Sequence, residues 1–220
     1  MIVNGIAAVV IAYLIGSISG AYVFTRLVAG KDIRKLGGGN AGARNVYRSV
    51  GLKAAVPTAI VDVGKGALAV VIAHRLVGLP PMQLLGTPQI FVLAAGLAAV
   101  AGHIWPIYLK FGGGNGLSAV IGVLAILMPR ELLVALGLMV VFTVVTRNPV
   151  LSVNIGLLTV PVFAWFSEEP GQYVVFPIVL ALVLILHFVP DAKAALNSAG
   201  SRQNLLADLV RTEDSKKRDG

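Results

Sequence analysis

Long apolar runs separated by short polar segments dominate this 220-residue chain. Most of the runs come near the ~20 residues that a helix needs to cross a bilayer. A backbone in hydrocarbon must satisfy its own hydrogen bonds, which a helix does. The pattern therefore predicts an all-α fold, a polytopic membrane bundle of about seven transmembrane helices. The runs lie at about residues 3–28, 54–78, 89–109, 117–129, 131–146, 150–167 and 172–189.

The same pattern divides the chain into one integral membrane domain over residues 1–197 and a polar cytoplasmic tail over residues 198–220. The composition agrees, with 57% hydrophobic and only 13% charged residues, whereas a soluble domain carries about 25% charged residues. The first run has no basic segment before it and no convincing cleavage site, so we expect it to be retained as the first span.

The distribution of basic residues predicts the orientation. The formal charge of +8 would suggest nucleic-acid binding in a soluble protein. Here the Lys and Arg residues gather in residues 31–53, after the third and fifth runs, and in the tail. All of these segments share one side if the N-terminus is outside and the C-terminus inside. The positive-inside rule therefore predicts an N-out/C-in protein whose partner is the lipid bilayer, with no nucleic-acid partner.

Two ionisable residues, Asp62 and Lys65, lie within the second run. They are three apart, so they share one face of a helix. One interpretation is a local ion pair with a lysine that reaches the interface. Because burial of ionisable groups at membrane depth costs much free energy, we favour a functional role or support of a functional loop.

The small residues of segment 16–20 lie in the first run. For them we expect close helix packing.

Two glycine-rich loops suggest chemistry. Residues 37–42 read GGGNAG, within a segment 31–53 that holds six Lys or Arg, and residues 111–116 read FGGGNG. Glycines let backbone N–H groups converge on phosphate oxygens, and basic side chains add charge. The first loop also fits G-x-G-x-x-G, but without a preceding strand we discount a dinucleotide site. We predict an anion site at the membrane surface; the alternative is a pair of flexible turns.

Four motifs carry a resemblance: DIRKLGGGNAGARNVYR at residues 32–48, DVGKG at 62–66, GHIWP at 102–106 and FGGGNG at 111–116. In order and spacing they resemble the signatures of the bacterial acyl-phosphate:glycerol-3-phosphate acyltransferases, which are small polytopic membrane enzymes. The resemblance covers about residues 5–197. It implies seven spans, N-out and C-in, in the bacterial cytoplasmic membrane.

The resemblance implies transfer of an acyl group from acyl phosphate to the 1-hydroxyl of glycerol 3-phosphate, giving lysophosphatidate for phospholipid synthesis. Acyl phosphate is already activated, so positioning and charge stabilisation can suffice without a nucleophilic side chain, a cofactor or a metal. The implied catalytic residues are Asn115, His187 and Asp191. The implied substrate-binding residues are Gly37, Gly39, Asn40, Gly42, Asn45, Arg48, Lys65, His103, Gly113 and Gly114.

Several positions depart from the family pattern. Gly38 stands where the family has Ser, and Asn115 where it has Lys. Phe188 and Asp191 stand where the last span of the family has His and then Asn, with His187 one residue away. The chain is therefore identified as a divergent member. Two alternatives stay open: a catalytically weak or inactive anion-binding relative, acting as a regulator or transporter, and an acyltransferase with another acceptor.

Overall fold

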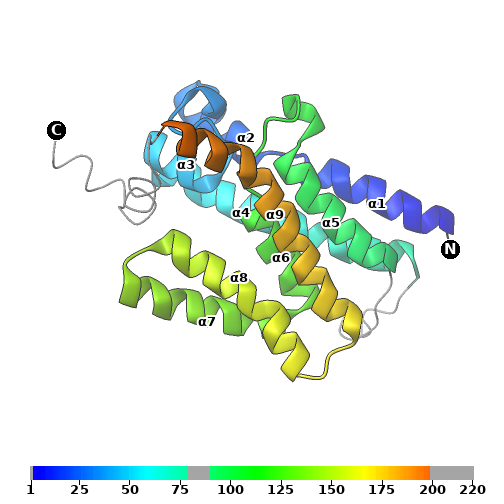
Figure 1. Cartoon of the computed structure of the whole chain (residues 1–220). Helices are drawn as coiled ribbons and strands as arrows, with labels where there is room; N and C mark the ends of the chain where they lie inside the picture. Colours follow the sequence, from blue (N-terminus) through cyan, green and yellow to red (C-terminus); the bar gives the residue numbers. More distant parts are fainter. Residues whose placement is uncertain (1, 79–89, 199–220) are drawn as a thin grey trace.

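The computed structural model describes residues 2–78 and 90–198, and side chains within them except at 149–150 and 188–198. Over these ranges the regular elements are helices, as the apolar runs predict (Figure 1). The α-helices are α1 (Ile2–Gly16), α2 (Gly20–Ala29), α3 (Ala43–Ser49), α4 (Leu52–Leu76), α5 (Ile90–Ile104), α6 (Leu117–Leu127), α7 (Pro129–Thr146), α8 (Pro149–Phe166) and α9 (Gly171–Ser198). Two short 3₁₀ helices, η1 (Ile33–Lys35) and η3 (Ile107–Leu109), lie in the loops.

The first predicted span is not one continuous helix, which corrects the sequence-based expectation. The helix stops at Gly16 and restarts at Gly20. The hydroxyl of Ser19 accepts a hydrogen bond from the N–H of Tyr22 at 3.2 Å and so caps the new helix. The break lies inside an apolar stretch, so its backbone groups need partners from elsewhere in the protein.

Small residues allow the helices to approach closely, as expected for segment 16–20. A Cβ on Gly16 of α1 would overlap the backbone of Ala99 on α5, and one on Gly102 would overlap Tyr13. At the crossing of α4 and α6, a Cβ on Gly122 would likewise overlap the backbone of Val63. Close approach of this kind is the usual route to helix association in membranes.

The helices form a layered bundle in which α1 lies along α5 and α4 along α6, while α7, α8 and α9 follow as successive antiparallel neighbours (Figure 1). Four segments are long and apolar enough to cross a membrane: Ile2–Ala29, Leu52–Leu76, Ile90–Leu109 and Pro129–Thr146. Three apolar helices are shorter: Leu117–Leu127, Leu151–Phe166 and Gly171–His187. The count of seven crossings and the N-out/C-in orientation stay predictions. The predicted tail lies almost wholly outside the described residues.

Candidate active site

The first glycine loop, residues 37–42, is shaped by Asn45 from α3. The buried Asn45 side chain donates to the carbonyl oxygens of Leu36 at 3.0 Å and Asn40 at 2.8 Å. Its Oδ1 accepts a hydrogen bond from the N–H of Gly38 at 3.1 Å. The sequence suggested Asn45 as a phosphate ligand, but in the structure its amide holds the loop backbone. Its position in the motif could not distinguish the two roles.

Two glycines of this loop adopt backbone angles that other residues avoid. Gly37 has φ 54° and Gly39 has φ 76°, both in the left-handed region. A Cβ at Gly37 would also overlap the side chain of Asn45. Gly38 is different, because a Cβ there would meet nothing within 4 Å. Gly42 follows in extended conformation at the start of α3.

The second glycine loop lies against His103, near the end of α5. The N–H of Gly114 donates to the carbonyl oxygen of His103 at 3.1 Å. A Cβ on Gly113 would overlap the carbonyls of His103 and Ile104, and one on Gly114 would overlap the His103 ring. Only glycine therefore fits at these two positions. His103 is itself buried and lies under the loop.

The two glycine loops contact each other directly, although 75 residues separate the partners of one of their hydrogen bonds. The N–H of Ala41 donates to the carbonyl oxygen of Gly113 at 2.9 Å. The side-chain amide of Asn40 donates to Oδ1 of Asn115 at 3.0 Å. The two predicted loops therefore lie against each other and are joined by hydrogen bonds.

Arg34, which the sequence motifs did not single out, also joins the two loop regions. Its guanidinium donates to the carbonyl oxygen of Leu109 at 2.8 Å and pairs with Asp32 at 2.7 Å. Its hydrogen bond holds the pKa of the Asp32 carboxyl below its usual range, and Asp32 in turn raises the pKa of Arg34. The Asp-x-Arg spacing within the first motif was the available signal.

A buried polar network supports the break between α1 and α2. Lys65 and Asp62 form an ion pair at 2.8 Å, which was one of the two interpretations of their spacing, and both are buried. The ammonium group of Lys65 donates to the carbonyl oxygen of Ile18 at 2.6 Å, and the Asp62 carboxylate accepts from the N–H of Gly20 at 3.4 Å. His103 Nδ1 lies 3.8 Å from the same carboxylate. The helix α4, far away in sequence, thus satisfies two backbone groups of the broken span.

Three of the predicted residues remain to be described: Arg48, His187 and Asp191. Arg48 is exposed on α3 and has an interaction partner. His187 of α9 packs edge-on against Trp105, with ring centroids 5.8 Å apart, and Trp105 directly precedes the turn to the second loop. Asp191 belongs to α9, but its side chain lies outside the described side chains. No group of three or more His, Cys, Asp or Glu suited to a metal occurs among the described residues.

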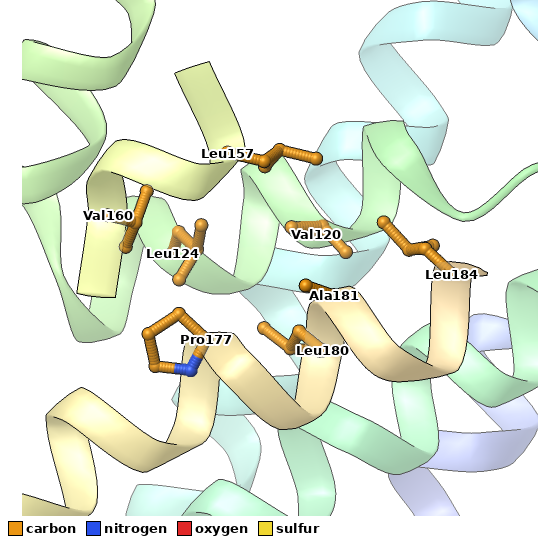
Figure 2. Close-up of a pocket in the computed structure, with 8 residues that line it drawn as sticks. All are labelled: Val120, Leu124, Leu157, Val160, Pro177, Leu180, Ala181 and Leu184. Atoms are coloured by element: carbon orange, nitrogen blue, oxygen red, sulfur yellow. The ribbon is translucent and has the colours of Figure 1, made fainter. Parts of the chain in front are cut away.

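An apolar gap begins next to the second loop and runs between α6, α8 and α9 (Figure 2). At its loop end, a Cβ on Gly116 would overlap the side chain of Leu184. The gap is narrow, with room for about one water. Its lining is wholly apolar: Val120, Leu124, Leu157, Val160, Pro177, Leu180, Ala181 and Leu184.

Comparison with known proteins gives one consistent family. A family model described as Glycerol-3-phosphate acyltransferase matches residues 6–198. Glycerol-3-phosphate acyltransferase 1 of Dehalococcoides mccartyi is 36% identical over 212 residues, covering 94% of this chain and 98% of the relative. Glycerol-3-phosphate acyltransferase of Thermoanaerobacter sp. is 37% identical over 193 residues, covering 88% and 92%.

Two crystal structures are also similar to this chain. Both are of PlsY (YgiH), an integral membrane glycerol 3-phosphate acyltransferase. The glycerol 3-phosphate form superposes with TM-score 0.75 at 27% identity, and the lysophosphatidic acid form with 0.74 at 25%. Each match covers 88% of this chain and 92% of the other. None of these names favours the regulator or transporter alternative.

Proposed function

Since the chain belongs to the glycerol-3-phosphate acyltransferase family, we propose that it transfers an acyl group from acyl phosphate to the 1-hydroxyl of glycerol 3-phosphate. The hydroxyl oxygen forms a bond to the acyl carbon, the bond from that carbon to the phosphate oxygen breaks, and inorganic phosphate leaves. The product is lysophosphatidate for phospholipid synthesis. The observation that carries the proposal is the direct contact between the two glycine loops, because the reaction requires two phosphates to be held side by side.

Each loop serves one phosphate. The first loop offers the backbone N–H groups of Gly37, Asn40 and Gly42, and Arg48 on the adjacent α3 supplies charge. Gly39 shapes the turn through its left-handed backbone, and its own N–H donates to the carbonyl oxygen of Leu36 at 3.0 Å. The second loop, with Gly113, Gly114 and Asn115, holds the other phosphate. Charge builds on the carbonyl oxygen and the leaving phosphate during the reaction, so fixed donors at this junction stabilise the transition state.

Three predicted substrate-binding residues act through the loops in this proposal. Asn45 keeps the first loop folded through its bonds to Leu36 and Asn40. His103 supports the second loop through its carbonyl oxygen and its ring. Lys65 holds the broken first span beside them through the carbonyl oxygen of Ile18.

Asn115, His187 and Asp191 are proposed as the catalytic residues. Asn115 presents a neutral amide where the family pattern has a lysine. His187 and Asp191 are four apart on α9, so they share one face of that helix. In the proposed reaction His187 accepts the single proton of the attacking hydroxyl, and Asp191 supports the resulting imidazolium by its negative charge.

The acyl chain is proposed to follow the apolar gap between α6, α8 and α9. The gap starts beside Gly116 and Leu184, one helical turn from His187, and its lining offers only apolar contacts. Because the gap is narrow, the chain enters by parting α8 and α9. Burial of methylene groups then contributes binding free energy of about 0.8 kcal/mol per CH₂.

The experiment that tests the proposal uses the purified protein in lipid nanodiscs with acyl phosphate and isotope-labelled glycerol 3-phosphate. Mass spectrometry is expected to identify 1-acyl lysophosphatidate. Glycerol and dihydroxyacetone phosphate serve as comparison acceptors. A chain that acylates one of these but not glycerol 3-phosphate would overturn the assigned acceptor, and a chain that forms no product would overturn the assigned reaction.

A further inference from the structure

An open hollow with a basic lining lies beside the first glycine loop, where α2 ends and η1 begins. Its lining residues are Arg26, Lys31, Asp32, Lys35 and Leu36. We call these five residues the basic hollow. The hollow is open and has a volume of about 410 Å³. It therefore exceeds by far the roughly 10–15 Å³ that a single water requires.

The charge of the basic hollow is strongly positive and partly fixed in place. Its one carboxylate, Asp32, is already paired with Arg34 at 2.7 Å. The three cations of the lining, Arg26, Lys31 and Lys35, form no ion pair with a carboxylate of the described residues. One of them, Arg26, donates to the carbonyl oxygen of Gly30 at 2.9 Å, which anchors its guanidinium at the edge of the hollow. Such a group of cations suits a phosphate, which accepts several charge-assisted hydrogen bonds.

An apolar surface adjoins the basic hollow along α2. Val23, Leu27 and Val28 are 43%, 74% and 49% exposed, whereas Gly20, Ala21 and Thr25 of the same helix are buried. In a membrane protein, large exposed apolar side chains next to the polar interface face lipid tails. A soluble phosphate would contact the cations alone, whereas a phospholipid would contact both surfaces.

We propose that the basic hollow binds the headgroup of an anionic phospholipid of the surrounding bilayer, with the lipid tails along the exposed face of α2. Basic residues near a membrane surface attract anionic lipids in this way. The bound lipid steadies η1, whose last residue, Lys35, lies two positions before Gly37. Through Leu36, which accepts a hydrogen bond from Asn45, this effect reaches the first glycine loop.

The test compares the parent with the double variant Lys31→Gln/Lys35→Gln. The control Lys53→Gln/Arg75→Gln removes the same charge from exposed positions elsewhere. Each protein is placed in phosphatidylcholine bilayers with and without phosphatidylglycerol, and retained lipid is counted by native mass spectrometry. We expect the hollow variant to bind phosphatidylglycerol about tenfold more weakly or worse, and the control to match the parent. Equal retention by all three proteins would overturn the proposal.

Two further readouts distinguish a bound phospholipid from a bound free phosphate. Inorganic phosphate at millimolar concentration should leave the bound lipid in place. Ready displacement by phosphate would overturn the lipid assignment, because the lipid tails would then contribute nothing to binding. Phosphatidylglycerol should raise the acyltransferase rate of the parent and the control but not that of the hollow variant. This last readout rests on the proposed function. If the parent forms no product in any bilayer, the proposed function fails while the retention measurement still decides the lipid site.

Discussion

Asn40 and Asn115 show how single residues define the site. Their side-chain bond, at 3.0 Å, joins two loops that the sequence could only place on the same side of the membrane. The glycine motifs predicted two loops on one side, and the structure brings these loops into contact. The sequence could not predict that the Asn45 amide turns inward to the loop backbone, since its position allows either direction. The cross-loop contact of Arg34 was missed for a related reason: its partner is a backbone carbonyl at Leu109, which no motif marks.

The Asn40–Asn115 bond gives a prediction for a double-mutant cycle. A net hydrogen bond contributes about 0.5–1.5 kcal/mol. We therefore expect Asn40→Ala and Asn115→Ala each to lower kcat/KM by roughly threefold or more. The double variant should lose clearly less than the product of the two single losses, because both remove the same contact. Losses that multiply fully would show that the two amides act independently.

At the scale of helices, the break between α1 and α2 is the main departure from the sequence-based expectation. Residues 16–20 read GSISG and contain no charged residue, so a hydropathy average over a window of spanning length gives one span across them. The groups that stabilise the break, Asp62 and Lys65, come from α4, more than forty positions away. Their shared face was predictable from spacing, but the broken backbone that they satisfy was not.

This network predicts that removing one charge of the Lys65–Asp62 pair lowers stability more than removing both. Lys65→Met leaves the Asp62 carboxylate and the Ile18 carbonyl without their cation, and removal of one partner from a buried pair costs about 3–5 kcal/mol. We expect a clearly lowered thermal midpoint in detergent. Adding Asp62→Asn should recover part of that loss. A single Lys65→Met variant as stable as the parent would mean that the network does not support the break.

The network also has a kinetic consequence that a purely structural role would not produce. In the proposal, Lys65 affects catalysis by holding the glycine loops in position. Lys65→Arg keeps the positive charge, so its kcat at saturating substrate should lie between the values of Lys65→Met and the parent. In Lys65→Met protein that stays folded, we expect kcat to fall more than KM rises. A rise in KM alone would instead indicate direct contact between Lys65 and a substrate phosphate.

The apolar gap gives a second prediction at this scale. Ala181→Phe adds a ring to the lining, so long acyl phosphates should lose kcat/KM while short ones are little affected. Leu186→Phe is the matched control, since it changes the same helix at a side chain that is 67% exposed. Acyl-chain preference is measured with a series of acyl phosphates. An unchanged chain-length profile for Ala181→Phe would place the acyl chain elsewhere.

For the whole molecule, the sequence predicted the class of fold, and the structure confirms an all-helical fold over the described residues. The similar crystal structures are of an integral membrane enzyme, in agreement with the apolar helices. Apolar length alone carries this information, because helices are one of the few ways to satisfy a backbone in lipid. The orientation depends on charge bias between the two sides, which the arrangement of helices does not itself record. The predicted N-out/C-in orientation therefore needs a separate test.

Cysteine labelling tests this orientation cleanly, because the chain has no native cysteine. Single cysteines at positions 40 and 168 are treated with an impermeant thiol reagent in intact bacterial cells. The positive-inside rule predicts labelling at position 168 and none at position 40 until the cells are opened. Labelling of position 40 alone in intact cells would contradict the predicted orientation.

In the proposed function, the paired glycine loops hold acyl phosphate and glycerol 3-phosphate side by side. The acyl group passes from the first substrate to the 1-hydroxyl of the second. Phosphate release from acyl phosphate by the purified protein, followed with and without glycerol 3-phosphate, measures this transfer directly. We expect release that depends on the acceptor and equals the lysophosphatidate formed, mole for mole. Release that proceeds equally without glycerol 3-phosphate would reveal simple hydrolysis, and the absence of release with both substrates present would contradict catalysis by this site.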